Sequence, residues 1–193
     1  MLNLKLAFAA ATTVAAFAAT AQAQNIVIDL SQPNEITISS TTAPATATVS
    51  GQDGTGFYFA DFYSVPLSGG TGDTLIAGDL TSANDTSDLT PDIFRFTDST
   101  GLNVFSYTNT PDSSFTAGSR AFTGSATWTL SAGSYAEMIA GGDRSGSIYF
   151  PADSDDDLAN ATIVGTYLVN TVVPEPASLG LLGLAGLALV RRR

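Results

Sequence analysis

The stretch Ala121-Phe122-Thr123-Gly124-Ser125-Ala126-Thr127-Trp128-Thr129-Leu130 has the clearest alternation of apolar and polar side chains in this sequence. Its even-numbered residues, Phe122 to Leu130, fall on one side of an extended chain, and mostly hydroxyl-bearing residues fall on the other. A period of two, rich in Thr and aromatic residues, is typical of a half-buried β-strand. We therefore expect a strand here, with Trp128 in the core.

Segments of the same kind lie on both sides of this stretch. The pattern predicts further strands over 25–30, 35–40, 46–50, 94–96, 104–107, 147–150 and 162–173, and a central strand over 57–66, which is apolar on both faces. Clusters of Gly, Asp, Ser and Asn separate these segments. Helical periodicity is not convincing in any window of about 11 residues, so crossover helices are missing and parallel pairing is not expected. The predicted fold is all-β, an antiparallel β-sandwich or jelly roll.

The beginning of the chain has the pattern of a secretory signal peptide. Lys5 precedes an apolar run over 6–19, and Ala21-Gln22-Ala23 supplies small residues for a cleavage site. A charged start, an apolar stretch and an A-x-A site together indicate export. We expect residues 1–23 to form a signal helix that signal peptidase removes, with Ala21 and Ala23 at the cleavage site.

The other end of the chain contains a short apolar segment with marked boundaries. Pro174-Glu175-Pro176 precedes residues 177–190, and Arg191, Arg192 and Arg193 follow them. The apolar segment makes a helix of roughly 21 Å, which is shorter than the ~30 Å hydrocarbon core of a membrane. The prolines separate this helix from the preceding chain, and the arginines can reach lipid headgroups on the cytoplasmic side. We expect a short hydrophobic helix that inserts transiently in the inner membrane.

This arrangement of Pro174, Glu175 and Pro176, the apolar segment and the arginine cluster resembles the PEP-CTERM sorting signal. The resemblance covers residues 173–193. It implies processing by an exosortase, a membrane cysteine transpeptidase of Gram-negative and related bacteria that make exopolysaccharide. It also implies export, transient anchoring, and a final location at the cell surface or outside the cell. It does not indicate what the domain over 24–172 does.

The composition of residues 24–172 restricts the function of this domain. The segment has the length of one domain, and the chain contains neither cysteine nor histidine. Seventeen carboxylates against three arginines give it a net charge of −14, so it should repel nucleic acid. Without cysteine or histidine, the chain cannot use Ser-His or Cys-His pairs for catalysis. It also cannot build a zinc site from His and Cys. A glycosidase needs two carboxylates, but Glu35 and Glu137 show no signature of such a pair. We therefore expect no enzyme.

The run Asp153-Ser154-Asp155-Asp156-Asp157 is the sharpest candidate site. In an extended loop, Asp153, Asp155 and Asp157 would point the same way and could hold Ca²⁺. The EF-hand pattern fails, and a solvated acidic turn that discourages edge-to-edge pairing is the alternative. Calcium is the only cofactor left open. A second loop, with Asp85, Asp88 and Asp92, has an irregular spacing that indicates little.

The aromatic residues allow two interpretations. Five tyrosines could stack on sugar rings, although most adjoin apolar residues and packing is the expected role: Tyr58, Tyr63, Tyr107, Tyr135 and Tyr149. The sequence therefore predicts an exported surface or extracellular-matrix structural protein that associates with exopolysaccharide. The alternative is a β-sandwich module that binds glycan or calcium, and a glycosidase-like enzyme is the third and least favoured hypothesis.

Overall fold

The computed structural model describes residues 23–52, 56–67, 70–84, 91–96, 98–106, 112–142 and 144–171. Their secondary structure is almost entirely β, which confirms the predicted fold class. The elements are β1 (Ile26–Asp29), β2 (Glu35–Ser40), β3 (Val49–Gln52), β4 (Phe57–Phe59), β5 (Thr74–Gly78), β6 (Thr81–Ser82), β7 (Pro91–Phe94), β8 (Leu102–Ser106), β9 (Asp112–Phe115), β10 (Phe122–Thr123), β11 (Ser125–Thr129), α1 (Ala132–Ile139), β12 (Arg144–Phe150), the 3-10 helix η2 (Asp155–Asp157) and β13 (Thr162–Asn170).

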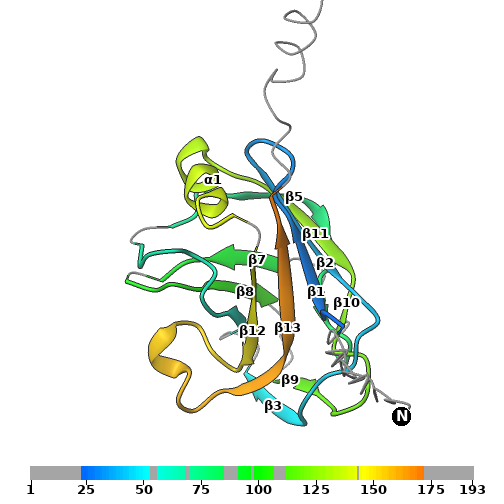
Figure 1. The fold of residues 1–193 in the computed structure, drawn as a ribbon. Helices are drawn as coiled ribbons and strands as arrows, with labels where there is room; N and C mark the ends of the chain where they lie inside the picture. Colours follow the sequence, from blue (N-terminus) through cyan, green and yellow to red (C-terminus); the bar gives the residue numbers. More distant parts are fainter. Residues whose placement is uncertain are drawn as a thin grey trace, which may run out of the picture.

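Nine of these strands form one large sheet, in the order β5-β11-β2-β1-β13-β12-β4-β8-β7. The sheet curls so that its edge strands β5 and β7 approach each other, giving a nearly closed, barrel-like layer (Figure 1). Two small sheets, β10–β6 and β3–β9, accompany it. The sandwich or jelly-roll arrangement stays a prediction.

The pairing of β1 with β13 corrects the expectation of a purely antiparallel sheet. These two strands are parallel, with Ile26 opposite Tyr167 and Asp29 opposite Asn170, and they run side by side in Figure 1. The other pairs in the sheet are antiparallel. No crossover helix is needed, because the connection between the first and the last strand is the rest of the domain. The argument from missing helices was therefore wrong for this pair.

The segment over 121–130 alternates as predicted, but it is divided between two sheets. Phe122, Ala126 and Trp128 are buried, while Thr123, Ser125 and Thr127 are only partly covered. Gly124 separates β10 from β11 with a φ of +79°, and a Cβ there would lie 2.4 Å from the carbonyl oxygen of Asp79. Glycine is therefore required at the point where the chain leaves one sheet for the other.

One other predicted strand needs correction, and some strands were not predicted. Residues 57–66 do not form one central strand, because β4 ends at Phe59 and the chain turns at Asp61, whose φ is +57°. Phe62 and Tyr63 are nevertheless buried, which explains why this segment is apolar on both faces. The edge strand β5 and the short strand β9 escaped prediction, since an edge strand need not alternate in burial and β5 is largely exposed.

Helix α1 was also not predicted. Its eight residues are shorter than the window that periodicity requires. The hydroxyl of Ser131 accepts a hydrogen bond from the backbone N–H of Ser134 at 3.1 Å and caps the helix. The helix covers one end of the barrel, the end at which β13 finishes (Figure 1). Among the described residues, no helix is long and apolar enough to cross a membrane.

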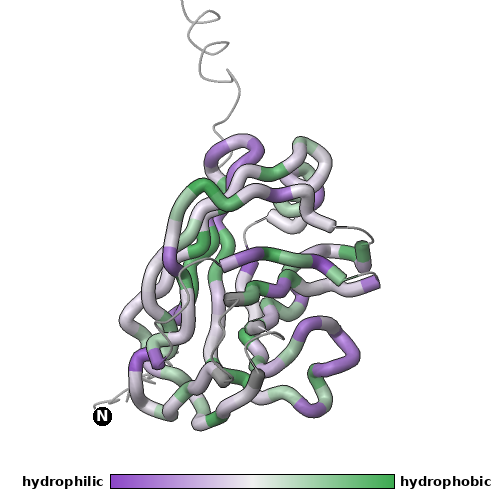
Figure 2. Tube along the Cα trace, turned by 180° about the vertical axis from the view of Figure 1, so that it is seen from behind, coloured by the Kyte–Doolittle hydropathy of each residue, from purple (hydrophilic) through white to green (hydrophobic). Residues whose placement is uncertain are grey.

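The core lies inside the curled sheet and is dominated by aromatic side chains. Phe57, Phe122, Phe115 and Phe150 form a chain of ring contacts with centroid separations of 5.0–5.2 Å, which joins the large sheet to both small ones. Trp128 is fully buried, and Tyr58, Tyr63 and Tyr135 are buried as well, which confirms their packing role. Tyr107 lies outside the described residues. Figure 2 shows hydrophobic strands, with hydrophilic colour concentrated in the connecting loops.

Candidate ligand-binding site

The acidic run lies in the loop between β12 and β13, at the end of the barrel opposite α1 (Figure 1). Asp155, Asp156 and Asp157 form one turn of 3-10 helix, so the chain here is not the extended loop that the sequence analysis assumed. The carboxylate oxygens that lie within 4.8 Å of one another belong to Asp153, Asp156 and Asp157, whereas Asp155 is bonded to Tyr58 and Thr100. The structure therefore brings Asp156, and not Asp155, together with Asp153 and Asp157.

Asp155 is fixed to the body of the domain by three donors. The hydroxyl of Tyr58 donates to its Oδ1 at 2.5 Å, and the backbone N–H of Thr100 donates to its Oδ2 at 2.8 Å. The Thr100 hydroxyl adds a bond of 3.1 Å to Oδ2. Charge-assisted bonds of this length are among the strongest in proteins. Asp155 thus anchors the loop between β12 and β13 to the Ser99–Thr100 turn.

Tyr58 is suited to this anchoring role. It lies on β4, which pairs with β12 and β8, its side chain is fully buried, and its hydroxyl also contacts Ser99 Oγ. Burial, and next the hydrogen bond to Asp155, raise the pKa of Tyr58 well above its ordinary value of 10.0. The phenol therefore stays protonated and donates throughout the physiological range.

The carboxylates that converge in this loop belong to Asp153, Asp156 and Asp157. One oxygen from each lies within 4.8 Å of the others, and Asp156 is exposed. Ser154 donates to Asp153 Oδ1 at 2.9 Å and also contacts Asp156. Burial, followed by a hydrogen bond with Asp157, raises the pKa of Asp153. The geometry offers oxygen ligands of the kind a hard cation prefers. Calcium binding itself stays a prediction.

A pocket of about 420 Å³ lies beside this cluster. Its wall combines an aromatic ring, three carboxylates and two hydroxyls: Phe96, Asp98, Ser99, Ser154, Asp155 and Asp156. Asp98 stands at a φ of +59°, in the turn that places its side chain at the rim. The run Asp98-Ser99-Thr100-Gly101 is one of the clusters that predict a loop, but its pattern does not indicate a site. No sequence pattern could indicate this pocket, because β7 and β8 meet the β12–β13 loop only in the folded chain.

Phe96 belongs to a small group of aromatic rings at the edge of the sheet. It packs edge-to-face against Phe94, with centroids 4.8 Å apart, and against Phe105 at 6.5 Å. Phe94 is 37% exposed and Phe96 is partly exposed, so this group reaches the surface. The pocket therefore has one apolar wall and one acidic wall.

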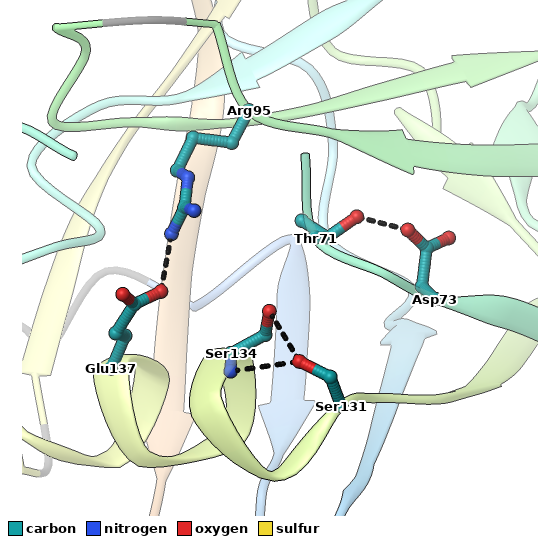
Figure 3. Close-up of polar contacts among 6 residues, drawn as sticks. All are labelled: Thr71, Asp73, Arg95, Ser131, Ser134 and Glu137. Carbon is teal, nitrogen blue, oxygen red and sulfur yellow. Dashed lines mark hydrogen bonds and ion pairs between the residues drawn. The ribbon is translucent and has the colours of Figure 1, made fainter. Parts of the chain in front are cut away.

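Among the other candidate residues, Glu137 has a structural partner. Glu137 on α1 accepts from buried Arg95 at 2.6 Å, as Figure 3 shows, and this pair joins the helix to the chain that follows β7. Glu35 lies on β2. Asp92 lies on β7 near Asp73, while Asp85 and Asp88 lie outside the described residues.

The first described residues are hydrogen-bonded to the rest of the domain. The sheet hydrogen bonds begin at Gln24 and Asn25: the carbonyl of Gln24 accepts from the Thr41 hydroxyl at 2.5 Å, and the N–H of Asn25 donates to Thr166 at 2.8 Å. Within the described part of the chain, the first of these hydrogen bonds lies just after Ala23, where the signal peptide is predicted to end. Residues 1–22, with Ala21, lie outside the described residues, as do residues 172–193 with Pro174, Glu175, Pro176 and Arg191 to Arg193.

Residues 172–193 match the PEP-CTERM protein-sorting motif. This chain is therefore an exported protein whose sorting depends on exosortase-type machinery. The comparisons give no match to a curated protein and none to a solved structure.

Proposed function

We propose that this chain is a surface or extracellular-matrix protein that associates with exopolysaccharide after signal peptidase has removed residues 1–23. The sorting segment holds it transiently in the inner membrane before display or release. The pocket of about 420 Å³ beside Asp156, with its aromatic and acidic walls, is the observation that carries the proposal. Aromatic rings stack on the apolar faces of sugars, and carboxylates accept hydrogen bonds from sugar hydroxyls.

The position of the pocket supports this proposal. The pocket borders the loop that precedes β13, whereas the sorting segment follows β13 directly. The nine residues of β13 span roughly 27 Å at about 3.3 Å per residue. A molecule held by its C-terminal segment would therefore present the pocket away from the membrane, toward polymer outside the cell.

We propose binding and not catalysis, because the chain lacks histidine and cysteine and Glu137 is occupied by Arg95. Cosedimentation with exopolysaccharide purified from the producing strain tests this function. Wild-type protein should cosediment, and a Phe96→Ala/Asp156→Asn variant should lose most of that binding. Equal binding of both proteins would remove the pocket from the proposal.

Sorting is tested separately, by the intact mass of the mature protein from cells with and without the exosortase. We expect a mass lower by most of the residues after Pro176 only where the enzyme is present. Retention of the segment over 177–190 in both cells would overturn the processing proposal.

A second candidate function is calcium binding by Asp153, Asp156 and Asp157, which the convergence of their oxygens within 4.8 Å favours. Saturating calcium should raise the melting temperature of the wild-type protein, since a ligand that binds only the folded state stabilises it. The Asp156→Asn variant should lose this response, and the matched variant Asp61→Asn should keep it. An unchanged melting temperature in millimolar calcium would exclude the site.

A further inference from the structure

We propose that the folded barrel restricts access to the sorting motif, and that processing requires the end of β13 to separate from its neighbouring strands. This inference rests on the proposed processing near Pro176 and adds a step that controls its rate. It is argued from the distance between β13 and the motif, from the elements that flank the end of β13, and from the pairing of its last residues.

The sorting motif follows the barrel almost directly. The backbone N–H of Leu30 donates to the carbonyl of Asn170 at 2.9 Å, and the match to the PEP-CTERM motif begins at residue 172. Three residues separate Asn170 from Pro174, so the Cα atoms of these two residues lie at most about 14 Å apart even when the chain is fully extended. A domain of about 100 residues already has a radius of gyration of about 13 Å. A protein that binds Pro174 in a groove must therefore meet the end of the barrel.

A collar of two elements flanks the end of β13. It consists of the turn between β1 and β2, over residues 30–34, and of helix α1, which covers this end of the barrel (Figure 1). The hydroxyl of Tyr135 on α1 donates to the carbonyl of Leu30 at 2.8 Å. Arg144 of β12 donates to the carbonyl of Met138 at 2.9 Å and so ties the other end of the helix to the sheet. The collar therefore cannot move aside without the loss of these bonds.

The last residues of β13 differ in how firmly they are held. Asn170 pairs with Asp29 of β1, whereas β12 begins at Arg144, opposite Val169. Within the described part of the chain, Asn170 is thus paired on one side only, while Val169 is paired on both sides and fully buried. Strand ends open locally at little cost, but exposure of a buried valine costs more. The form in which both residues are free is therefore a minor one, and it extends the reach of the motif by about 7 Å.

The extent of the motif favours opening of β13 over docking of the machinery on the collar. The match covers residues 172–193 and no residue of the barrel, so the recognised element is the segment itself. Separation of β13 gives access to this segment without a further binding surface. Cleavage of a locally opened form follows the population of that form when opening and closing are fast. The stability of the end of β13 should therefore set the rate of processing.

A spacer between the barrel and the motif tests this inference. About six residues of alternating Gly and Ser, inserted between Thr171 and Val172, form a flexible coil and extend the reach by roughly 20 Å. In pulse-chase labelling of cells that contain the exosortase, processing should become about tenfold faster, because access no longer requires exposure of Val169. Slower processing would mean that the machinery docks on the collar, and an unchanged rate would mean that the barrel does not restrict access. Either result would overturn the inference.

A disulfide makes the opposite change. Asp29→Cys/Asn170→Cys places two thiols on paired residues, of which Asp29 is exposed and Asn170 partly exposed, in a chain without other cysteines. Neighbouring strands have the separation that a disulfide needs. The cross-link should slow processing by about tenfold, and the spacer should restore the rate. Ser50→Cys/Ser114→Cys, the same cross-link between β3 and β9, is the control and should leave the rate unchanged.

Two alanine variants separate local opening from a general loss of stability. Val169 and Val164 are both fully buried on β13, but Val164 lies near the other end of the strand. Val169→Ala should speed processing by about threefold or more, since it weakens the packing that keeps the end of β13 closed. Val164→Ala should leave the rate close to that of the wild type. Equal acceleration by both variants would assign the effect to overall stability and contradict the inference.

Elastase digestion measures access to the motif without the sorting enzyme. This protease cleaves after small aliphatic residues such as Val172, and the substrate is the exported protein purified from cells without the exosortase. Loss of the C-terminal segment, followed by intact mass, should be faster with the spacer and slower with the Asp29→Cys/Asn170→Cys disulfide. Absence of processing in wild-type cells would contradict the proposed processing alone. Equal elastase cleavage of all these proteins would contradict the restriction by the barrel.

Discussion

The phenol of Tyr58, on β4, donates a hydrogen bond of 2.5 Å to Asp155, which lies 97 residues later in the β12–β13 loop. This contact joins a buried strand to the acidic turn and shapes one wall of the pocket. It also removes Asp155 from the group of carboxylates that face solvent. The chemistry of the site therefore depends on a core tyrosine that has no sequence signature of function.

Replacement of Tyr58 by phenylalanine should loosen this loop. The change removes the donor and leaves Asp155 with Thr100 alone, so we expect a loss of about 1–2 kcal/mol of unfolding free energy. Urea denaturation measures this loss, and hydrogen exchange over 153–158 should become faster. Tyr149→Phe is the matched control, because the Tyr149 hydroxyl makes no hydrogen bond within the described part of the chain. Equal stability of both variants would contradict the anchoring role.

The ion pair between Arg95 and Glu137 should contribute to stability through the buried arginine. Arg95 is 4% exposed and Glu137 is 40% exposed, so water screens the carboxylate and the effect is smaller than in a fully buried pair. Glu137→Gln keeps an acceptor but removes the negative charge that Glu137 places beside the buried guanidinium, and should lower the unfolding free energy by about 1 kcal/mol. Glu35→Gln, the same change on β2, should cost much less. Denaturation in low and high salt compares the two, and a similar loss in both variants would refute this account.

Asp73 should make stability depend on pH. Burial raises the pKa of Asp73 above its ordinary value of 3.8; a hydrogen bond from Thr71 opposes this shift, and the neighbouring Asp92 reinforces it. The folded state therefore binds the proton more tightly than the unfolded state does. The stabilisation is complete below pH 3.8 and is lost as the pH rises through the raised pKa.

The raised pKa of Asp73 predicts how the stability of the Asp73→Asn variant should depend on pH. It should match the wild-type protein near the ordinary pKa of aspartate and become more stable than it at neutral pH, since it keeps an acceptor for Thr71 without the buried charge. Urea denaturation at pH values between the ordinary pKa of aspartate and neutrality measures the difference in unfolding free energy between the two proteins. The same substitution at the exposed Asp61 controls for the loss of one surface charge. A difference that is constant with pH, or that reverses, would show that Asp73 does not titrate in this way.

Asn25 should stabilise the β-domain through its buried side chain. Its side chain is 3% exposed, donates to the carbonyl of Pro44 at 2.8 Å and accepts from the N–H of Thr166 at 2.9 Å. Asn25→Ala leaves these buried groups unpaired and should cost about 3 kcal/mol. Thermal denaturation of the exported protein measures the loss, with exposed Asn160→Ala as the control. A melting temperature unchanged by Asn25→Ala would contradict this role of the side chain.

Local patterns predicted much of the fold because they report burial on a single strand. The alternation through Phe122 and Trp128 identified the core face of one segment correctly. It could not reveal that Gly124 divides that segment between two sheets, since a break at positive φ depends on the close approach of Asp79. Nor could it reveal the parallel pair β1–β13, because pairing depends on which strands meet in space.

The sequence by itself determined the sorting of this protein. Residues 172–193 match the PEP-CTERM protein-sorting motif by their order along the chain, which is sufficient to identify them. It also determined the all-β class and the strong negative charge. Only the tertiary structure decided the site: Tyr58 turns Asp155 inward, Asp156 replaces it beside Asp153 and Asp157, and Phe96 closes the pocket. These positions depend on contacts between distant segments, which no local periodicity encodes.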